Sequence, residues 1–294
     1  MNFFKTTLLL ILFSSMIPEK KPVKTTTSVD PNFHIYLCIG QSNMEGFAPI
    51  EEVDRNVDPR AMVFQTVDCN NLKRKKGEWY TAIPPLANCY FTDQVGLSPS
   101  NSFVNTMVNS LPDSIKVGII NVSVAGCDIR LFDKDDYQKY FDTYDPDTWF
   151  RNKISDYQNH PYHHLVQYAR LAQQQGVIKG ILLHQGETNN GTPDREKWPE
   201  YVQKIYQDLI TDLALNKETP PPLLVGELVD KKQGGIEAEM NDIIATLPSK
   251  IDHCYVISSE DCLAQKDSVH FSSEGVRLLG QRYAKQMLEL LPLQ

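Results

Sequence analysis

Two short motifs near opposite ends of the 294-residue chain carry residue types that perform acyl transfer. The first, GQSNM at residues 40–44, contains Ser42, whose hydroxyl is a candidate nucleophile. The second, DSVH at residues 267–270, contains His270, a candidate general base, and Asp267, which is close enough in sequence to orient it. A serine hydroxyl is a weak nucleophile unless a base accepts its proton, so the chemistry requires a fold that brings the motifs together.

Each motif also has a simpler interpretation. Serine is among the commonest residues at a helix N-cap, so Ser42 alone fits a purely structural cap. An aspartate three residues before a histidine occurs in many surface turns. Neither motif predicts an enzyme by itself, and the surrounding elements must decide between the two interpretations.

The residues before Ser42 predict a buried strand that leads into a tight turn. Residues 34–39 form a short run rich in aliphatic and aromatic side chains, which is typical of a strand in a protein core. Gly40 allows a sharp turn and a close approach of other groups to the backbone. We therefore expect Ser42 to begin a helix, where backbone N–H groups have no partner within the helix.

Apolar runs and helical patterns alternate about five times after residue 31, which predicts one α/β domain with a parallel sheet covered on both faces. Ligands bind such sheets beyond the carboxyl ends of the strands. Residues 68–99 are irregular, and residues 128–160 fit an insertion over the site. The expected strands are 34–39, 61–67, 116–124, 177–183, 223–228 and 254–258, and the expected helices are 102–111, 164–175, 198–213, 236–247 and 276–290.

Composition excludes some classes of function. The formal net charge of −8 and pI near 5.4 argue against a nucleic-acid-binding protein, which needs a basic face. No cysteine or histidine spacing matches a zinc site, and the histidines at 160, 163 and 164 lack a matching set of acidic or cysteine ligands. We expect no metal and no cofactor.

The first 27 residues fit a secretory signal and flexible lead-in, followed by one folded domain at 28–294. Lys5 precedes an apolar run at 7–13 that is too short to span a bilayer. The alternative is an uncleaved N-terminal anchor. We expect a secreted or periplasmic protein with no membrane association after the signal is removed.

Six cysteines permit disulfide bonds in an oxidising compartment. The pairs Cys69–Cys89 and Cys254–Cys262 lie in loop-like surroundings and are the plausible local bridges. Cys38 lies within the first predicted strand and fits a small buried hydrophobic residue.

Four segments together resemble the SGNH (GDSL-like) hydrolase superfamily. They are GQSNM after the first strand, Gly126 after the third, HQGE at 184–187 after the fourth, and DSVH before the last helix. Within the superfamily the chain is similar, from about residue 32, to the branch of carbohydrate esterase family six and the sialate O-acetylesterases. The resemblance implies a three-layer α/β/α sandwich with a parallel, flavodoxin-like sheet of about five strands.

The resemblance also implies roles for particular residues. Ser42 would be the nucleophile, His270 the general base and then acid, and Asp267 the group that orients His270. The Ser42 N–H and the Gly126 N–H would belong to the oxyanion hole.

The fourth segment departs from the superfamily pattern, because HQGETN at 184–189 replaces the usual Gly-x-Asn-Asp. Gln185 is then the first choice, and Asn189 the second, for a side-chain amide in the oxyanion hole. Glu187 is either a catalytic acid or a carboxylate that holds loops together. The second segment, SVAGCD at 123–128, lacks the common Gly-Gly pair but keeps Gly126.

By resemblance the partner is an acetylated carbohydrate. We expect acetylxylan or a related polysaccharide to be the substrate, with O-acetylated sialic acid as the close runner-up. Gln41, Asn43 and Trp149 are the residues expected to contact the sugar. Two further classes fit less well: a lipase or thioesterase, and a carbohydrate-binding protein on an inactive hydrolase scaffold. The oligomeric state stays open.

Overall fold

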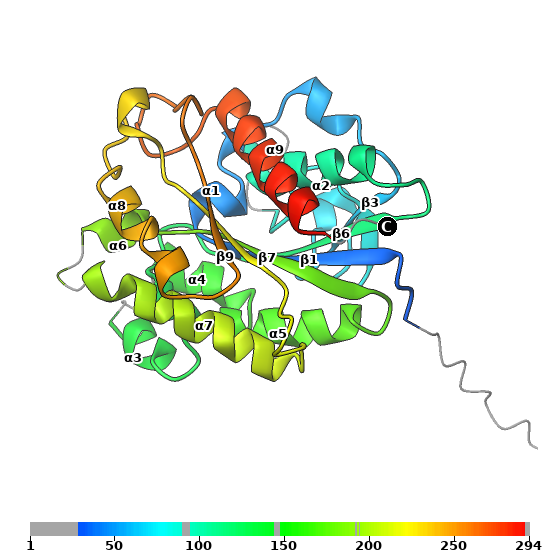
Figure 1. The fold of residues 1–294 in the computed structure, drawn as a ribbon, viewed down its shortest axis with the longest axis horizontal. Coiled ribbons are helices and arrows are strands. Elements are labelled where there is room, and N and C mark those ends of the chain that lie inside the picture. Colours follow the sequence, from blue (N-terminus) through cyan, green and yellow to red (C-terminus); the bar gives the residue numbers. More distant parts are fainter. Residues whose placement is uncertain (1–28, 90–94, 144–147, 192, 194, 292–294) are drawn as a thin grey trace, which may run out of the picture.

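A seven-stranded sheet runs through the middle of the computed structural model, which describes residues 29–89, 95–143, 148–191, 193 and 195–291 (Figure 1). The predicted signal segment, residues 1–27, lies outside the described residues. Within the described part of the chain, no helix has both the length and the apolar character needed to cross a bilayer.

The sheet order is β4-β3-β6-β1-β7-β8-β9. All neighbouring pairs are parallel except β3 and β4, which are antiparallel. A separate antiparallel ladder joins β2 to β5. The strands are β1 (Phe33–Gly40), β2 (Ala48–Pro49), β3 (Ala61–Phe64), β4 (Trp79–Thr81), β5 (Val95–Leu97), β6 (Lys116–Ser123), β7 (Val177–His184), β8 (Leu223–Gly226) and β9 (Cys254–Ile257).

The predicted parallel α/β architecture is confirmed, but the expected count of about five strands is wrong for the main sheet. Strands β6-β1-β7-β8-β9 follow the flavodoxin-like order 2-1-3-4-5, and β3 and β4 extend this unit beyond β6. The segment 68–99 was expected to be irregular, yet it contributes β4 and β5. Each of these strands has three residues, which is too short to show an alternating pattern.

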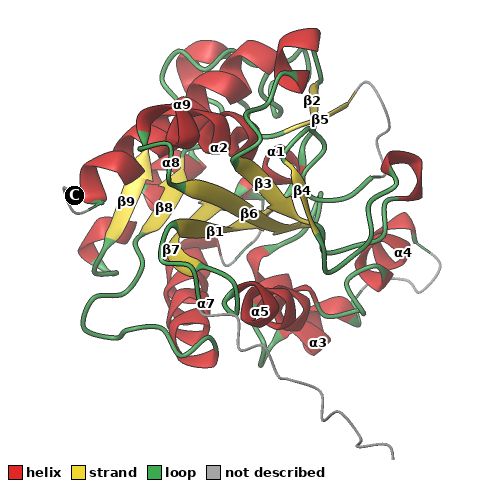
Figure 2. Ribbon diagram, turned by 90° about the vertical axis from the view of Figure 1, so that its right-hand side faces the viewer, coloured by secondary structure: helices red, strands yellow, loops and turns green. Residues whose placement is uncertain are grey.

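Helices cover both faces of the sheet (Figures 1 and 2). Helices α2 and α9 pack on one face with Tyr36 and Cys38 of β1, while α5 and α7 pack on the other face with Ile35 and Leu37. Alternate residues of β1 are thus buried in two different cores, which explains its continuous apolar sequence. The helices are α1 (Ser42–Glu45), α2 (Pro99–Ser110), α3 (Tyr137–Phe141), α4 (Trp149–Ser155), α5 (Pro161–Ala172), α6 (Glu187–Asn190), α7 (Trp198–Asp212), α8 (Met240–Ile244) and α9 (Ser273–Leu290).

Capping residues set several of the helix boundaries. The Ser272 hydroxyl accepts a hydrogen bond from the Gly275 N–H and caps α9. Helix α5 begins earlier than expected because His160 accepts from the His163 N–H and a proline occupies the first turn. The helix expected over 236–247 is confined to α8, and residues 247–249 form a 3-10 turn.

The predicted insertion, residues 128–160, is more regular than its sequence indicates. It contains a 3-10 turn at Ile129–Phe132 and the short helices α3 and α4. These elements are too short for a helical period to be visible in the sequence. Their buried side chains, including Phe132 and Ile154, join the core on the α5 and α7 face.

One of the two predicted disulfides is present. Cys69 and Cys89 are bonded, whereas Cys254 and Cys262 are free, buried thiols. Cys254 belongs to the core on the α7 face and Cys262 to the core on the α9 face. The expected Cys254–Cys262 bridge is therefore wrong, because the sheet separates the two side chains.

Candidate active site

The predicted site segments meet at the carboxyl ends of β1, β6 and β7. The Val124 N–H donates to the Gly40 carbonyl at 3.0 Å, and the Gln41 N–H donates to the His184 carbonyl at 3.1 Å. The loops that follow the three strands are therefore joined directly through their backbones. A parallel sheet places its ligand sites at this edge.

The turn after β1 requires a glycine and presents Ser42. A Cβ atom at Gly40 would collide with the His184 carbonyl and the Met44 side chain. Ser42 is the first residue of α1, as predicted, and its side chain does not cap the helix. Its hydroxyl instead faces His270, which favours the chemical interpretation of the motif.

Ser42, His270 and Asp267 form a continuous hydrogen-bonded chain. The Ser42 Oγ lies 2.8 Å from His270 Nε2, and His270 Nδ1 lies 2.7 Å from Asp267 Oδ2. The other carboxylate oxygen of Asp267 accepts the backbone N–H groups of Val269 and His270, each at 3.0 Å. Nδ1 must carry a proton to bond the carboxylate, which leaves Nε2 able to accept the serine proton.

The environment of Asp267 favours its ionised form although about half of its side chain is exposed (49%). Partial burial opposes ionisation, but hydrogen bonds from the His270 ring and from the Val269 and His270 amides lower the pKa of the carboxyl. The ring of Phe47 stacks on the imidazole of His270 with centroids 4.3 Å apart and planes 18° apart. This contact restricts rotation of the imidazole.

Asn43 holds the loop that carries His270. Its amide nitrogen donates to Glu187 Oε1 at 2.7 Å and to the Val269 carbonyl at 3.1 Å, and its amide oxygen accepts the Phe271 N–H at 3.1 Å. The residues on both sides of His270 are thus bonded to one buried side chain. The structure gives Asn43 this positioning task in place of the predicted contact with sugar.

Glu187 contacts Asn43 and does not contact His270. Its Oε1 also lies 3.6 Å from His184 Nδ1. Burial lowers the pKa of His184, whose Nε2–H donates to the Glu227 carbonyl at 3.1 Å. Of the two roles predicted for Glu187, this geometry favours the carboxylate that holds loops together.

Two backbone amides are available to stabilise an oxyanion. Among the described residues, neither the Ser42 N–H nor the Gly126 N–H donates a hydrogen bond to another protein group. Gly126 has a φ of +75°, a conformation that L side chains rarely adopt, and it is exposed beside the site. The place of Gly126 in the oxyanion hole stays a prediction.

Gln185 does not face the site and is a correction to the prediction. It is completely buried, and its amide nitrogen donates to the Cys127 carbonyl, to Asn189 and to Gln41. The Trp198 indole N–H donates to its amide oxygen. Both hydrogens of the Gln185 amide are used within the protein, so none is left for an oxyanion.

Gln41 and Asn189 also connect loops. The Gln41 side-chain oxygen faces the Gly186 and Thr188 N–H groups at 3.5 and 3.4 Å, and its side chain is buried, which argues against the predicted contact with sugar. The Asn189 oxygen accepts the Ile129 N–H at 2.9 Å and thereby joins α6 to the loop after β6. Its assignment to the oxyanion hole stays a prediction.

Trp149, the first residue of α4, lies at the rim of the site. The six-membered part of its indole faces Gly126, where a Cβ atom would lie 3.5 Å from the ring. Its neighbour Phe150 is buried and packs edge-on against it, with centroids 5.8 Å apart. The Trp149 side chain is nevertheless 64% exposed, so most of the ring is available to a ligand.

Sequence reasoning missed Glu45 and Phe47, which both follow the GQSNM motif. Glu45 is buried, with its carboxylate bonded to the Ala125 N–H. Its position in the sequence could have identified it. Residues four apart on a helix are neighbours, so Glu45 must lie on the same face of α1 as Gln41. Phe47 gave no signal, because its stacking partner is remote in sequence.

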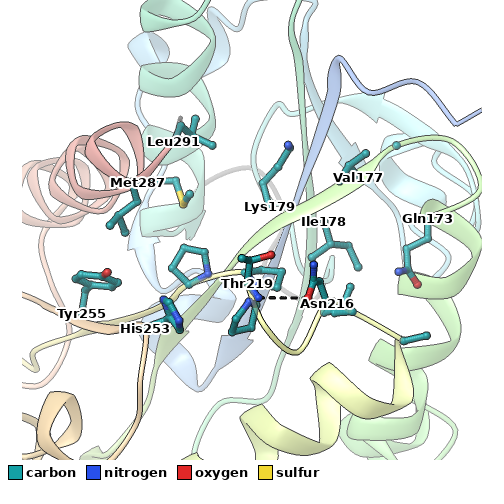
Figure 3. A pocket seen from close by; sticks show the side chains of 17 residues that line it. Gln173, Val177, Ile178, Lys179, Asn216, Thr219, His253, Tyr255, Met287 and Leu291 are labelled. Atoms are coloured by element: carbon teal, nitrogen blue, oxygen red, sulfur yellow. Dashed lines mark hydrogen bonds between the residues drawn. The ribbon is translucent and has the colours of Figure 1, made fainter. Parts of the chain in front are cut away.

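A cavity of about 640 Å³ lies at the opposite edge of the sheet and contains none of these residues (Figure 3). It is lined by the beginning of β7, the prolines before β8 and the end of α9, with Lys179, Tyr255 and Met287 among the labelled side chains. The described residues contain no group of three or more potential metal ligands.

The site geometry is that of a serine hydrolase on an α/β sandwich. Several solved structures share this fold. A protein from Arabidopsis thaliana matches with a TM-score of 0.66 and 19% identity, covering 88% of this chain and 99% of its own. NanS matches with a TM-score of 0.62 and 16% identity over 89% and 98% of the two chains. A carbohydrate acetylesterase from Xanthomonas citri matches with a TM-score of 0.58 and 16% identity over 88% and 57%.

A family model described as a carbohydrate esterase, sialic acid-specific acetylesterase, matches residues 32–289. The chain belongs to this family and is a carboxylic ester hydrolase.

The different contacts of Asp267 and Glu187 predict that neutralising each carboxylate changes kcat/KM by a different factor. Asp267→Asn should lower kcat/KM for 4-nitrophenyl acetate by about 10²–10⁴-fold, because an amide facing His270 favours the wrong tautomer. Glu187→Gln keeps an acceptor for Asn43 and should lose less than about tenfold. Steady-state kinetics of both variants, with circular dichroism as a check of folding, measures the difference. A larger loss in Glu187→Gln would assign the orienting role to Glu187.

Proposed function

We propose that this esterase removes O-acetyl groups from carbohydrate through an acetyl-enzyme intermediate. The observation that carries the proposal is the Ser42–His270–Asp267 chain, with contacts of 2.8 and 2.7 Å, beside two backbone amides for which no described group is an acceptor. These are the groups that ester hydrolysis needs: a nucleophile, an oriented base and donors for an oxyanion.

In the proposed mechanism, the Ser42 oxygen attacks the acetyl carbonyl while its proton moves to His270 Nε2. Negative charge develops on the carbonyl oxygen, which accepts hydrogen bonds from the Ser42 and Gly126 N–H groups. The intermediate then collapses, and the His270 proton passes to the departing sugar oxygen. A water molecule, activated by the neutral imidazole, attacks the acetyl-enzyme and releases acetate.

For the substrate we propose an acetylated neutral polysaccharide, with acetylxylan as the representative. Trp149 supports this choice because an exposed indole beside Gly126 offers a flat apolar surface to a sugar ring. Charge also supports it, since two basic groups in the segments beside the Gly126 loop have acidic partners. Arg130 bonds Asp128 through two nitrogens, and Lys153 pairs with Glu45.

O-acetylated sialic acid is the second candidate. It is favoured by the description of the matching family, which names sialic acid. A lipase or thioesterase is less well supported, because the described residues of the 128–160 segment form short helices and not a long apolar lid. A non-catalytic binding protein is disfavoured by the intact hydrogen-bonded chain at Ser42.

The proposed reaction predicts that the wild-type enzyme hydrolyses 4-nitrophenyl acetate and releases acetate from acetylated xylan. Ser42→Ala and His270→Ala should fold normally and lose at least about 10³-fold in kcat, because each removes a member of the nucleophile–base pair. Acetate release on acetylxylan and on 9-O-acetyl sialic acid should be compared in parallel. A clear preference for the sialic acid ester would replace the polysaccharide assignment, and activity retained in Ser42→Ala would remove Ser42 from the mechanism.

If Trp149 supports the sugar ring, Trp149→Ala should raise KM for acetylated xylo-oligosaccharides about tenfold. An aromatic contact contributes about 1–1.5 kcal/mol, which corresponds to this change in affinity. Hydrolysis of 4-nitrophenyl acetate, which has no sugar, should change less than about threefold. Trp149→Phe should recover most of the affinity, and Leu171→Ala on α5 is a control for loss of an exposed apolar side chain. An unchanged KM in Trp149→Ala would exclude the sugar contact.

We propose that the protein is exported, on the basis of Lys5 and the apolar run at 7–13. Protein recovered from the medium or periplasm of its host should begin beyond Phe13 and contain the Cys69–Cys89 bond. Mass spectrometry of the intact and peptide-mapped protein tests both points. Recovery from the cytosol with its first residues intact would reject export.

A further inference from the structure

A buried ion pair lies directly behind the predicted oxyanion loop and has no part in the proposed proton transfers. Glu45, at the end of α1, and Lys153, on α4, have side-chain exposures of only 1% and 5% and contact each other. The same carboxylate oxygen of Glu45 accepts from the Asn88 amide at 2.7 Å. Burial of two charges carries a large desolvation cost, so the pair calls for an explanation other than stability.

The second oxygen of Glu45 accepts the Ala125 N–H, the backbone group immediately before Gly126. This bond joins the loop after β6 to α1, the helix that begins with Ser42. The Gly126 amide belongs to the peptide that follows Ala125. Its direction therefore depends on how the Ala125 backbone is held.

The loop has further backbone contacts, and one of them closes a turn around Ala125 and Gly126. The Val124 N–H bonds the Gly40 carbonyl, and the Cys127 N–H bonds the Val124 carbonyl. Glu45 supplies the acceptor for the Ala125 N–H, the other half of the peptide group whose carbonyl closes this turn. A charged acceptor makes a stronger hydrogen bond than a neutral one, and this bond is shielded from water.

We infer that Glu45 is a positioning residue for the oxyanion hole, with Lys153 as the cation that balances its charge. Through Ala125, the carboxylate fixes the Gly126 N–H relative to the Ser42 N–H. The inference rests on the proposed function, because it concerns the same reaction. Residues 40–45 then have three tasks. Ser42 reacts with the substrate, Asn43 holds the His270 loop, and Glu45 holds the loop that carries Gly126.

The decisive variant is the double substitution E45M/K153M, which replaces the ion pair by two apolar side chains of similar length. Exchange of a buried ion pair for apolar residues is often neutral for stability. The acceptor for the Ala125 N–H is lost, so kcat for 4-nitrophenyl acetate should fall about 10–100-fold with little change in KM. Affinity for a boronic acid, which mimics the tetrahedral intermediate, should fall by a similar factor.

The double substitution E45Q/K153M is the matched rescue. Glutamine keeps an oxygen for the Ala125 N–H without the charge, so kcat should return to within about threefold of wild type. D54N/R277M removes a remote, partly buried ion pair and controls for the general effect of such a loss. It should leave both kcat and boronate affinity unchanged.

Thermal unfolding of each variant distinguishes a loss of folding from a loss of catalysis in the folded protein. A folded E45M/K153M with wild-type kcat and boronate affinity would overturn the inference. If E45M/K153M does not fold, E45Q/K153M decides, because kcat below a tenth of wild type in that folded variant would also overturn it. Wild-type hydrolysis of 4-nitrophenyl acetate, abolished in Ser42→Ala, is measured first, and its absence would reject the proposed function independently of Glu45.

Discussion

The site depends on a 2.8 Å hydrogen bond between Ser42 and His270, two residues that lie 228 positions apart in the chain. Ser42 follows β1, a strand buried along its whole length between β6 and β7. His270 lies on a loop, where an unsupported side chain would sample many orientations. Asn43 removes that freedom by bonding the backbone on both sides of His270. The rigid sheet thus places the nucleophile, and the residue next to it places the base.

The buried polar side chains beside β1 impose a second constraint, because their hydrogen bonds must be made within the protein. Gln41, Asn43, Glu45 and Gln185 are all buried near the carboxyl end of β1. A buried polar group is costly unless its hydrogen bonds are made, and each of these four bonds at least one backbone group of a neighbouring loop. The same contacts that satisfy the side chains also fix the loops. The polarity of the motif therefore serves the geometry of the site as well as its chemistry.

The sequence predicted the parts of the structure that depend on local pattern. Long apolar runs identified β1, β6 and β7, and the three-residue spacing of Asp267 and His270 predicted their contact. The sequence-based prediction failed where the outcome depends on the direction in which a side chain points. Gln185 has the right amide for an oxyanion hole, but its hydrogens are directed at other protein groups, among them the Cys127 carbonyl and Asn189. Cys254 and Cys262 are close in sequence, yet they lie on opposite faces of the sheet. Residue type and spacing do not report these directions.

The position of Lys153 has a consequence for how this enzyme can diversify. Segment 128–160 carries Trp149, the proposed sugar contact, so exchange of this segment is one route to a changed substrate range. The same segment supplies the cation that faces Glu45 beneath the nucleophile. A transplanted segment without that lysine would leave a carboxylate buried and unpaired, at a cost of about 3–5 kcal/mol. With Trp149 as the proposed sugar contact, one segment would then affect both substrate range and the catalytic centre, and a successful chimera must inherit Lys153 together with Glu45 or replace both.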